Sequence, residues 1–109
     1  MQSPLQELEA TYFTLQSQIN TLSQACQTQQ QRDAISAQYV QARQNYWACV
    51  NQAFHDDDPQ VVSLTTQIDA ANQQLSNAVQ QMGDITTTIN DITNVVTLGA
   101  QLAAKVIAV

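Results

Sequence analysis

The sequence has little positive charge, few glycines and prolines, and no long apolar run. Its three basic residues, Arg32, Arg43 and Lys105, are scattered along 109 residues. The chain has nine acidic residues, so the formal net charge is -6. Nucleic-acid binding needs clustered Lys and Arg to displace counterions from phosphates, so we expect no nucleic-acid partner. With only two glycines there is no Gly-rich phosphate loop.

Targeting and catalytic signals are also missing. Residues 1–10 contain neither a basic region nor an apolar one, so we expect no secretory signal peptide. No stretch of 18 purely apolar residues exists, which argues against an ordinary transmembrane helix. The expected location is therefore cytoplasmic, or outside the cell by a route without a cleaved signal. The one histidine, His55, has no catalytic partners at a recognisable spacing, so we expect neither an enzyme nor a cofactor.

What the sequence does have is a sustained heptad pattern in its second half. Apolar and small residues recur from Val61 to Val106 with alternating spacings of three and four, which is typical of a coiled-coil seam. A matching pattern runs from Leu5 to Cys26, after Ser3-Pro4 and Gln6, which together predict a capped helix start. The sequence therefore predicts an all-α protein.

The first pattern fails over the polar run 27–33 and resumes at Ile35. Because no proline or glycine lies there, we predict one continuous helix over about 4–54. Asp58-Pro59 predicts an N-cap followed by the first residue of a second helix, over about 59–108. The short turn 55–58 would make the two helices antiparallel neighbours in a single domain covering 1–109.

Two arrangements satisfy this pattern. The preferred one is a long antiparallel two-helix coiled-coil hairpin, a rod of helices about 75 Å long by the rise per residue. The alternative folds back near Gln31 and Gly83 into a compact four-helix bundle, in which Asp33 and Asp84 become N-caps.

The heptad seam predicts the function that we consider first, which is a non-enzymatic, self-assembling structural or secretion-associated subunit. Gln and Asn make up about a quarter of the chain, and such a weakly charged surface suits association with further copies or with another helical protein. The residues expected to form the helix–helix interface are Leu8, Leu15, Ile19, Leu22, Leu75, Met82, Ile85, Ile89, Ile92 and Val96.

The C-terminal segment 92–109 supports a second hypothesis, a membrane-active component of the pore-forming or toxin kind. It is apolar nearly all round and about 27 Å long as a helix, close to the thickness of a bilayer core. Small residues four apart allow close helix packing in lipid as well as in a protein core. The residues concerned are Val95, Leu98, Gly99, Leu102, Ala103 and Val106.

An aromatic face in the first half of the chain supports a third hypothesis, a chaperone or adaptor that binds a partner helix. Its residues are Tyr39, Tyr46, Trp47 and Phe54.

Two further groups have a structural and a functional interpretation. Cys26 and Cys49 lie on apolar stripes without metal-site or CxxC spacing, so we expect small buried side chains. His55 and the three aspartates that follow could hold a divalent cation, but helix capping already accounts for Asp58, and we predict no metal site.

In outline the chain resembles small secreted bacterial helical hairpins. The segment 58–62, DPQVV, resembles the polar, proline-containing turn of type III secretion needle subunits. WXG100 proteins are hairpins of similar size, but Trp47-Ala48-Cys49 is not their Trp-x-Gly motif and lies before the turn rather than in it. The resemblance covers topology and not motif, and the apolar C-terminus fits neither family.

Overall fold

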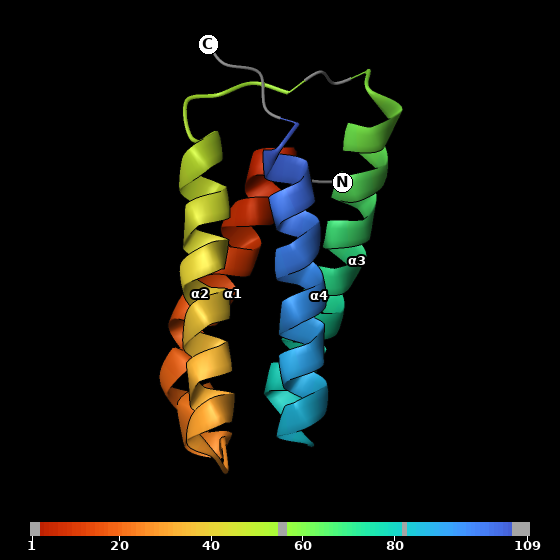
Figure 1. The fold of residues 1–109 in the computed structure, drawn as a ribbon. Helices are drawn as coiled ribbons and strands as arrows, with labels where there is room; N and C mark the ends of the chain where they lie inside the picture. Colours follow the sequence, from red (N-terminus) through yellow and green to blue (C-terminus); the bar gives the residue numbers. More distant parts are fainter. Residues whose placement is uncertain (1–2, 55–56, 82, 106–109) are drawn as a thin grey trace.

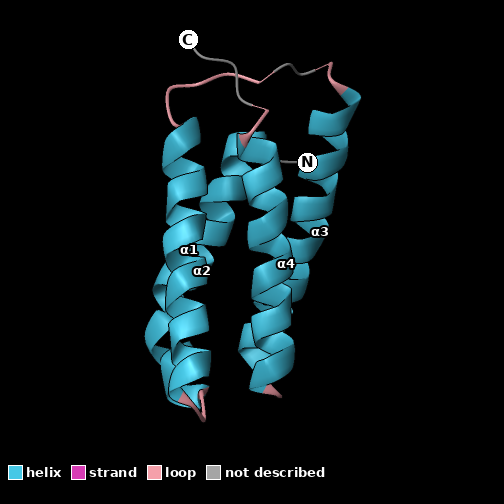
Figure 2. Ribbon diagram, viewed as in Figure 1, coloured by secondary structure: helices cyan, strands magenta, loops and turns pink. Residues whose placement is uncertain are grey.

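The computed structural model describes residues 3–54, 57–81 and 83–105. Within these ranges the chain forms four helices and no strand: α1 (Pro4–Ala25), α2 (Gln29–Cys49), α3 (Pro59–Gln81) and α4 (Ile85–Ala103). Figure 2 shows how nearly all of the described chain is helical. The all-α prediction is therefore confirmed.

Side chains that the sequence marks as caps begin three of the helices. The Ser3 hydroxyl accepts from the N–H of Gln6, and the Gln6 side chain accepts from the N–H of Ser3, which is the capping box at the start of α1. Asp58 accepts from the N–H of Gln60 at 2.8 Å, and Asp84 accepts from the N–H of Thr86 at 2.9 Å. These bonds satisfy amides that a helix start leaves free.

The predicted unbroken helix over 4–54 is wrong. The chain leaves α1 at Cys26 and begins α2 with a second capping box, in which Thr28 accepts from the N–H of Gln31 at 3.1 Å and Gln31 accepts from Thr28 at 3.3 Å. A helix continuing through this point would lose these bonds. Asp33, which the folded-back alternative assigned as the cap, lies inside α2 instead.

The predicted helix over 59–108 is interrupted as well. Helix α3 ends at Gln81 and α4 begins at Ile85, so two helices replace the expected one. The predicted extension of the helix to 108 reaches residues 106–109, which lie outside the described ranges, and α4 ends at Ala103.

The four helices lie side by side, with α1 and α4 between α2 and α3 in Figure 1. Antiparallel contacts join α1 to α2 and α3 to α4. Parallel contacts join α1 to α3 and α2 to α4, and α1 also touches α4 across the centre. Two hairpins therefore pack against each other, α1–α2 against α3–α4.

The expected contact across the turn 55–58 is absent from the described residues. Helices α2 and α3 do not touch each other. The described chain measures 43 × 21 × 18 Å with a radius of gyration of 13.8 Å. These dimensions, and the contacts among all four helices, favour the folded-back alternative over the 75 Å rod.

The expected interface residues lie mostly in the centre of this packing. Leu8, Leu15, Leu22, Leu75, Ile85, Ile92 and Val96 are buried, and Ile19 and Ile89 pack partly buried against them. Nothing is described of Met82. One chain thus covers its own heptad stripes, because each hairpin offers its apolar side to the other.

Candidate functional site

The most exposed aromatic side chain in the described ranges belongs to α2. Trp47 is 61% exposed, and Val40, 38% exposed, lies on the same outward side. Together with the partly buried Arg43 and with Val50, the partly buried cap residue that follows α2, they have the heptad spacing 40, 43, 47, 50. We call these four residues the outer stripe of α2. Its spacing is that of a helix that packs against another helix.

The positive charge of Arg43 lies close to the Trp47 ring on the outer stripe. The Arg43 guanidinium carbon lies 5.7 Å from the centre of the Trp47 ring, within the range of a cation–π contact. Beside the ring is a groove of about 420 Å³ lined by Tyr46, Trp47, Val50 and Asn51. Asn51 has a φ of 68°, a left-handed conformation that asparagine tolerates and that turns the chain away from α2.

The other predicted aromatic positions are engaged within the chain. The Tyr12 ring of α1 stacks on Tyr39 at 5.8 Å and on Tyr46 at 5.7 Å between ring centres. Phe54 is partly buried against the core. Of the predicted partner face, Trp47 alone has more than half of its surface exposed in the described ranges. Phe13 of α1, 48% exposed and 6.1 Å from the Tyr46 ring, extends the exposed aromatic surface.

A carboxylate borders the same surface. The Tyr46 hydroxyl donates to Glu9 Oε2 at 3.0 Å. This hydrogen bond, together with burial, raises the pKa of Tyr46 because the anion would face an existing negative charge. Glu9 of α1 and Arg43 of α2 therefore carry opposite charges next to neighbouring aromatic residues, Glu9 at Tyr46 and Arg43 at Trp47.

A second group of polar residues joins α1 to α3. Glu7 is only 1% exposed, although it lies in the first turns of α1. Asn72 of α3 donates to Glu7 Oε1 at 3.0 Å and to the Glu7 carbonyl at 3.1 Å, and Thr11 donates to Asn72 Oδ1 at 2.6 Å. A groove of about 690 Å³ opens beside them, lined by Gln6, Glu7, Ala10, Thr14, Asp69, Asn72, Gln73 and Ser76.

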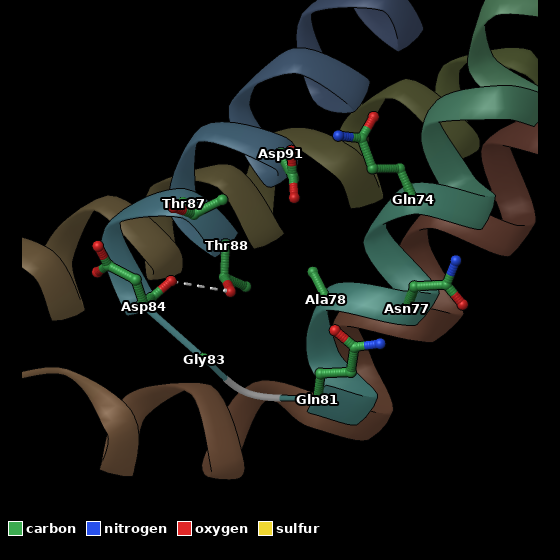
Figure 3. A pocket seen from close by; sticks show the side chains of 9 residues that line it. All are labelled: Gln74, Asn77, Ala78, Gln81, Gly83, Asp84, Thr87, Thr88 and Asp91. Atoms are coloured by element: carbon green, nitrogen blue, oxygen red, sulfur yellow. Dashed lines mark hydrogen bonds between the residues drawn. The ribbon is translucent and has the colours of Figure 1, made fainter.

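A third hollow, of about 300 Å³, lies between α3 and the start of α4. Figure 3 shows Thr88 and Asp91 of α4 pointing toward the space, with Ala78 of α3 on the other side. The Asp84 carboxylate is occupied in capping α4, and the Asp84 carbonyl accepts from the Thr88 hydroxyl. That leaves Asp91 as the uncommitted acid, and one carboxylate among amides is a weak basis for a site.

The segment expected to enter lipid contributes to the core instead. Val95, Leu102 and Gly99 are buried, while Leu98 and Ala103 are partly buried; Val106 is outside the described residues. A Cβ on Gly99 would lie 3.1 Å from Leu8 Cδ2, so its small size serves close packing of α4 on α1. None of the described helices is long and apolar enough to span a bilayer.

The remaining candidates show no ligand geometry in the described ranges. Cys26 and Cys49 are both buried and free, and burial raises the pKa of the Cys49 thiol. His55 and Asp56 lie outside the described residues, while Asp58 caps α3. No cluster of three metal-binding side chains occurs elsewhere in the described chain.

The outer stripe of α2 and the polar contact between Glu7 and Asn72 were not identified from the sequence. The outer stripe could have been found, since Val40 and Arg43 are seven and four residues before Trp47, which is heptad spacing. The link from Glu7 to Asn72 had no such signal, because 65 residues separate the partners and each looks like an ordinary solvated helix position.

No protein-family profile, curated protein or solved structure matches the chain.

Proposed function

We propose that this chain is a non-enzymatic helical interaction protein, and that it associates with a second copy of itself through the outer stripe of α2. The observation that carries the proposal is Trp47, a large aromatic side chain with 61% of its surface exposed on a stripe of heptad spacing. Exposed tryptophan and arginine side chains are the types that most often dominate binding energy at protein interfaces.

The distribution of charge supports a symmetric pair. A two-fold contact brings the same surface of each copy together, so it must be complementary to itself. Arg43 and Glu9 carry opposite charges on this surface, one in contact with Trp47 and the other with Tyr46. Two copies related by a two-fold axis can therefore place Arg43 of one near Glu9 of the other.

The proposal also includes the form of the free chain, which we take to be the folded-back four-helix bundle. The contacts between the hairpins support it. Small-angle scattering at low concentration tests it: we expect a radius of gyration close to 13.8 Å, with a small increment for hydration. A value well above 20 Å would instead indicate the extended rod.

Sedimentation velocity over a concentration series tests the self-association. We expect a reversible dimer that Trp47→Gln weakens at least tenfold, since losing a central aromatic anchor costs more than 1.4 kcal/mol. Val62→Gln is the matched control, because Val62 is 46% exposed on α3, away from the outer stripe. Both variants should keep the helical circular dichroism of the parent chain.

Two results would contradict self-association through this stripe. One is a monomer at every concentration, which would leave the stripe to a helix of another protein, as the adaptor hypothesis holds. The other is a dimer that Trp47→Gln and Val62→Gln weaken equally.

A further inference from the structure

Glu7 is a carboxylic acid in an unusual position for a first-turn residue. Its side chain is 1% exposed, and Oε1 accepts a hydrogen bond from Asn72 Nδ2 at 3.0 Å. Its second oxygen, Oε2, is buried and has no hydrogen-bond partner among the described residues. A charged carboxylate that is half satisfied and removed from water is costly, so an additional donor is expected at Oε2.

The neighbouring ionisable group is another acid, Asp69, one turn before Asn72 on α3. Both carboxyl groups line the groove between α1 and α3. Burial raises the pKa of Glu7, and Asp69 raises it further by hydrogen bonding and by charge, while the hydrogen bond from Asn72 lowers it. The Asp69 carboxylate is itself held by Gln73, whose Nε2 donates to Oδ2 at 3.3 Å.

No cation offsets this pair from the helices packed on α1. The basic residues of the described chain are engaged elsewhere: Arg32 donates to Gln29, Arg43 lies over Trp47, and Lys105 donates to Gln60. On α2, the Tyr46 hydroxyl faces Glu9, and no ionisable group of α2 or α4 acts on Glu7. Besides the hydrogen bond from Asn72, only the positive charge of the chain's amino terminus opposes the rise of the Glu7 pKa, and it is the weakest influence.

We propose that Glu7 keeps its proton in the folded chain and donates it to the Asp69 carboxylate across the groove, and that this hydrogen bond holds α1 to α3. With the proton present, the pair makes an acid–carboxylate hydrogen bond of the strong, charge-assisted kind. Without it, two negative charges face each other beside the groove, and one of them lies on a side chain that is almost fully buried. Because α1 and α3 belong to different hairpins, the proton controls how firmly the two hairpins hold together.

The direction of the pH effect follows from the raised pKa. A group whose pKa is raised by folding stabilises the folded state, and this stabilisation is fully present when the pH is below the ordinary pKa of the group, 4.5 for Glu7. The stabilisation is lost as the pH rises through the pKa of Glu7 in the folded chain. The unfolding equilibrium constant should increase by up to about tenfold per pH unit in this interval, the limit for one proton.

Carbon-13 NMR of the side-chain carboxyls in the intact chain tests the proposal directly. We expect the chemical shift of the Glu7 carboxyl carbon to titrate with a midpoint above pH 4.5. In Asp69→Asn the midpoint should fall, because the like charge is replaced by an amide that can donate to Oε2. A Glu7 midpoint at or below its ordinary value, or one that Asp69→Asn leaves in place, would overturn the proposed hydrogen bond.

Urea unfolding between pH 5 and 8 tests the consequence for the hairpins. The parent chain should lose stability as the pH rises, and Glu7→Gln, a neutral isostere, should flatten this dependence. Asp57→Asn is the control, since it removes one exposed carboxylate and should keep the parent slope. A Glu7→Gln variant that retains the parent slope contradicts the proposal, and if that variant does not fold, the titrations of the parent and of Asp69→Asn decide.

Discussion

Asn45 of α2 holds the backbone of Val96 in α4 by a hydrogen bond from Nδ2 to the carbonyl oxygen, at 3.2 Å. The other end of the same amide is also fixed, because Gln41 Nε2 donates to Asn45 Oδ1 at 2.8 Å. A Cβ built on Gly99 would lie 3.0 Å from Asn45 Nδ2. The close approach of α2 and α4 therefore depends on the absence of a side chain at Gly99.

Gly99→Ala should destabilise the chain, although alanine is the better helix former. The added methyl must displace either the amide of Asn45 or the side chain of Leu8, and overpacking of this kind costs about 1–3 kcal/mol against a helix-propensity gain of about 1. We expect a net loss of up to about 2 kcal/mol in urea unfolding. Gly83→Ala is the control, since no atom lies within 4 Å of its added Cβ. A gain in stability for Gly99→Ala would contradict the prediction, because it would show that Asn45 and Leu8 can move away from the added methyl without loss of stability.

Asn72→Ala should weaken the link between α1 and α3. The substitution removes the Asn72 amide, which donates to Glu7 Oε1 and to the Glu7 carbonyl and accepts from the Thr11 hydroxyl. The loss of these bonds at buried groups costs about 1–3 kcal/mol. Thermal and urea unfolding measure the loss. Asn77→Ala, at an exposed position of the same helix, should change the stability by no more than about 0.5 kcal/mol. Equal effects at the two positions would rule out a special role for Asn72.

Thr28→Ala should lower the free energy of unfolding by about 1 kcal/mol, because the first amides of α2 lose their cap. Thr28→Ser keeps the hydroxyl and should restore most of the loss. Circular dichroism during urea unfolding gives both values. If alanine and serine behave alike, the break between α1 and α2 does not depend on this cap.

The two cysteines should resist labelling in the folded chain. Cys49 is fully buried, and burial raises the pKa of its thiol, so little of the reactive thiolate is present near pH 8. With a thiol reagent such as Ellman's, we expect slow modification of Cys49 in buffer and rapid modification of both cysteines in urea. Labelling Cys26→Ser alone isolates Cys49, and fast reaction of that variant in buffer would contradict its burial.

Local signals in the sequence predicted two of the four helix starts, at Ser3 and Asp58, and the folded-back alternative added a third, at Asp84. Ser3, Asp58 and Asp84 stand where caps are expected, and all three accept from helix amides. The fourth start was missed although Thr28 and Gln31 have capping-box spacing, because the prediction looked for proline or glycine to end a helix. Its polar side chains supply the hydrogen bonds that allow the chain to reverse there.

The pairing of helices could not be predicted from the heptad pattern. The stripes specify which side of each helix is apolar, but the same stripes are buried in a long hairpin and in two short hairpins packed together. The polar contact of Glu7 with Asn72 shows the limit clearly, since neither residue carries a local sign of its distant partner. The outer stripe was only partly recognised, because Trp47 was grouped with tyrosines that turned out to contact α1.

The lack of contact between α2 and α3 has a consequence for the order of events in folding. Each hairpin joins two helices that are consecutive in the sequence, so its contacts close short loops and can form early. The contacts of α1 with α3 and of α2 with α4 close much longer loops and form only when both hairpins dock. Docking is then the slow step. Substitutions that weaken the contacts within one hairpin should slow refolding, because those contacts are already formed when the hairpins dock, whereas substitutions at contacts completed only after docking should mainly speed unfolding.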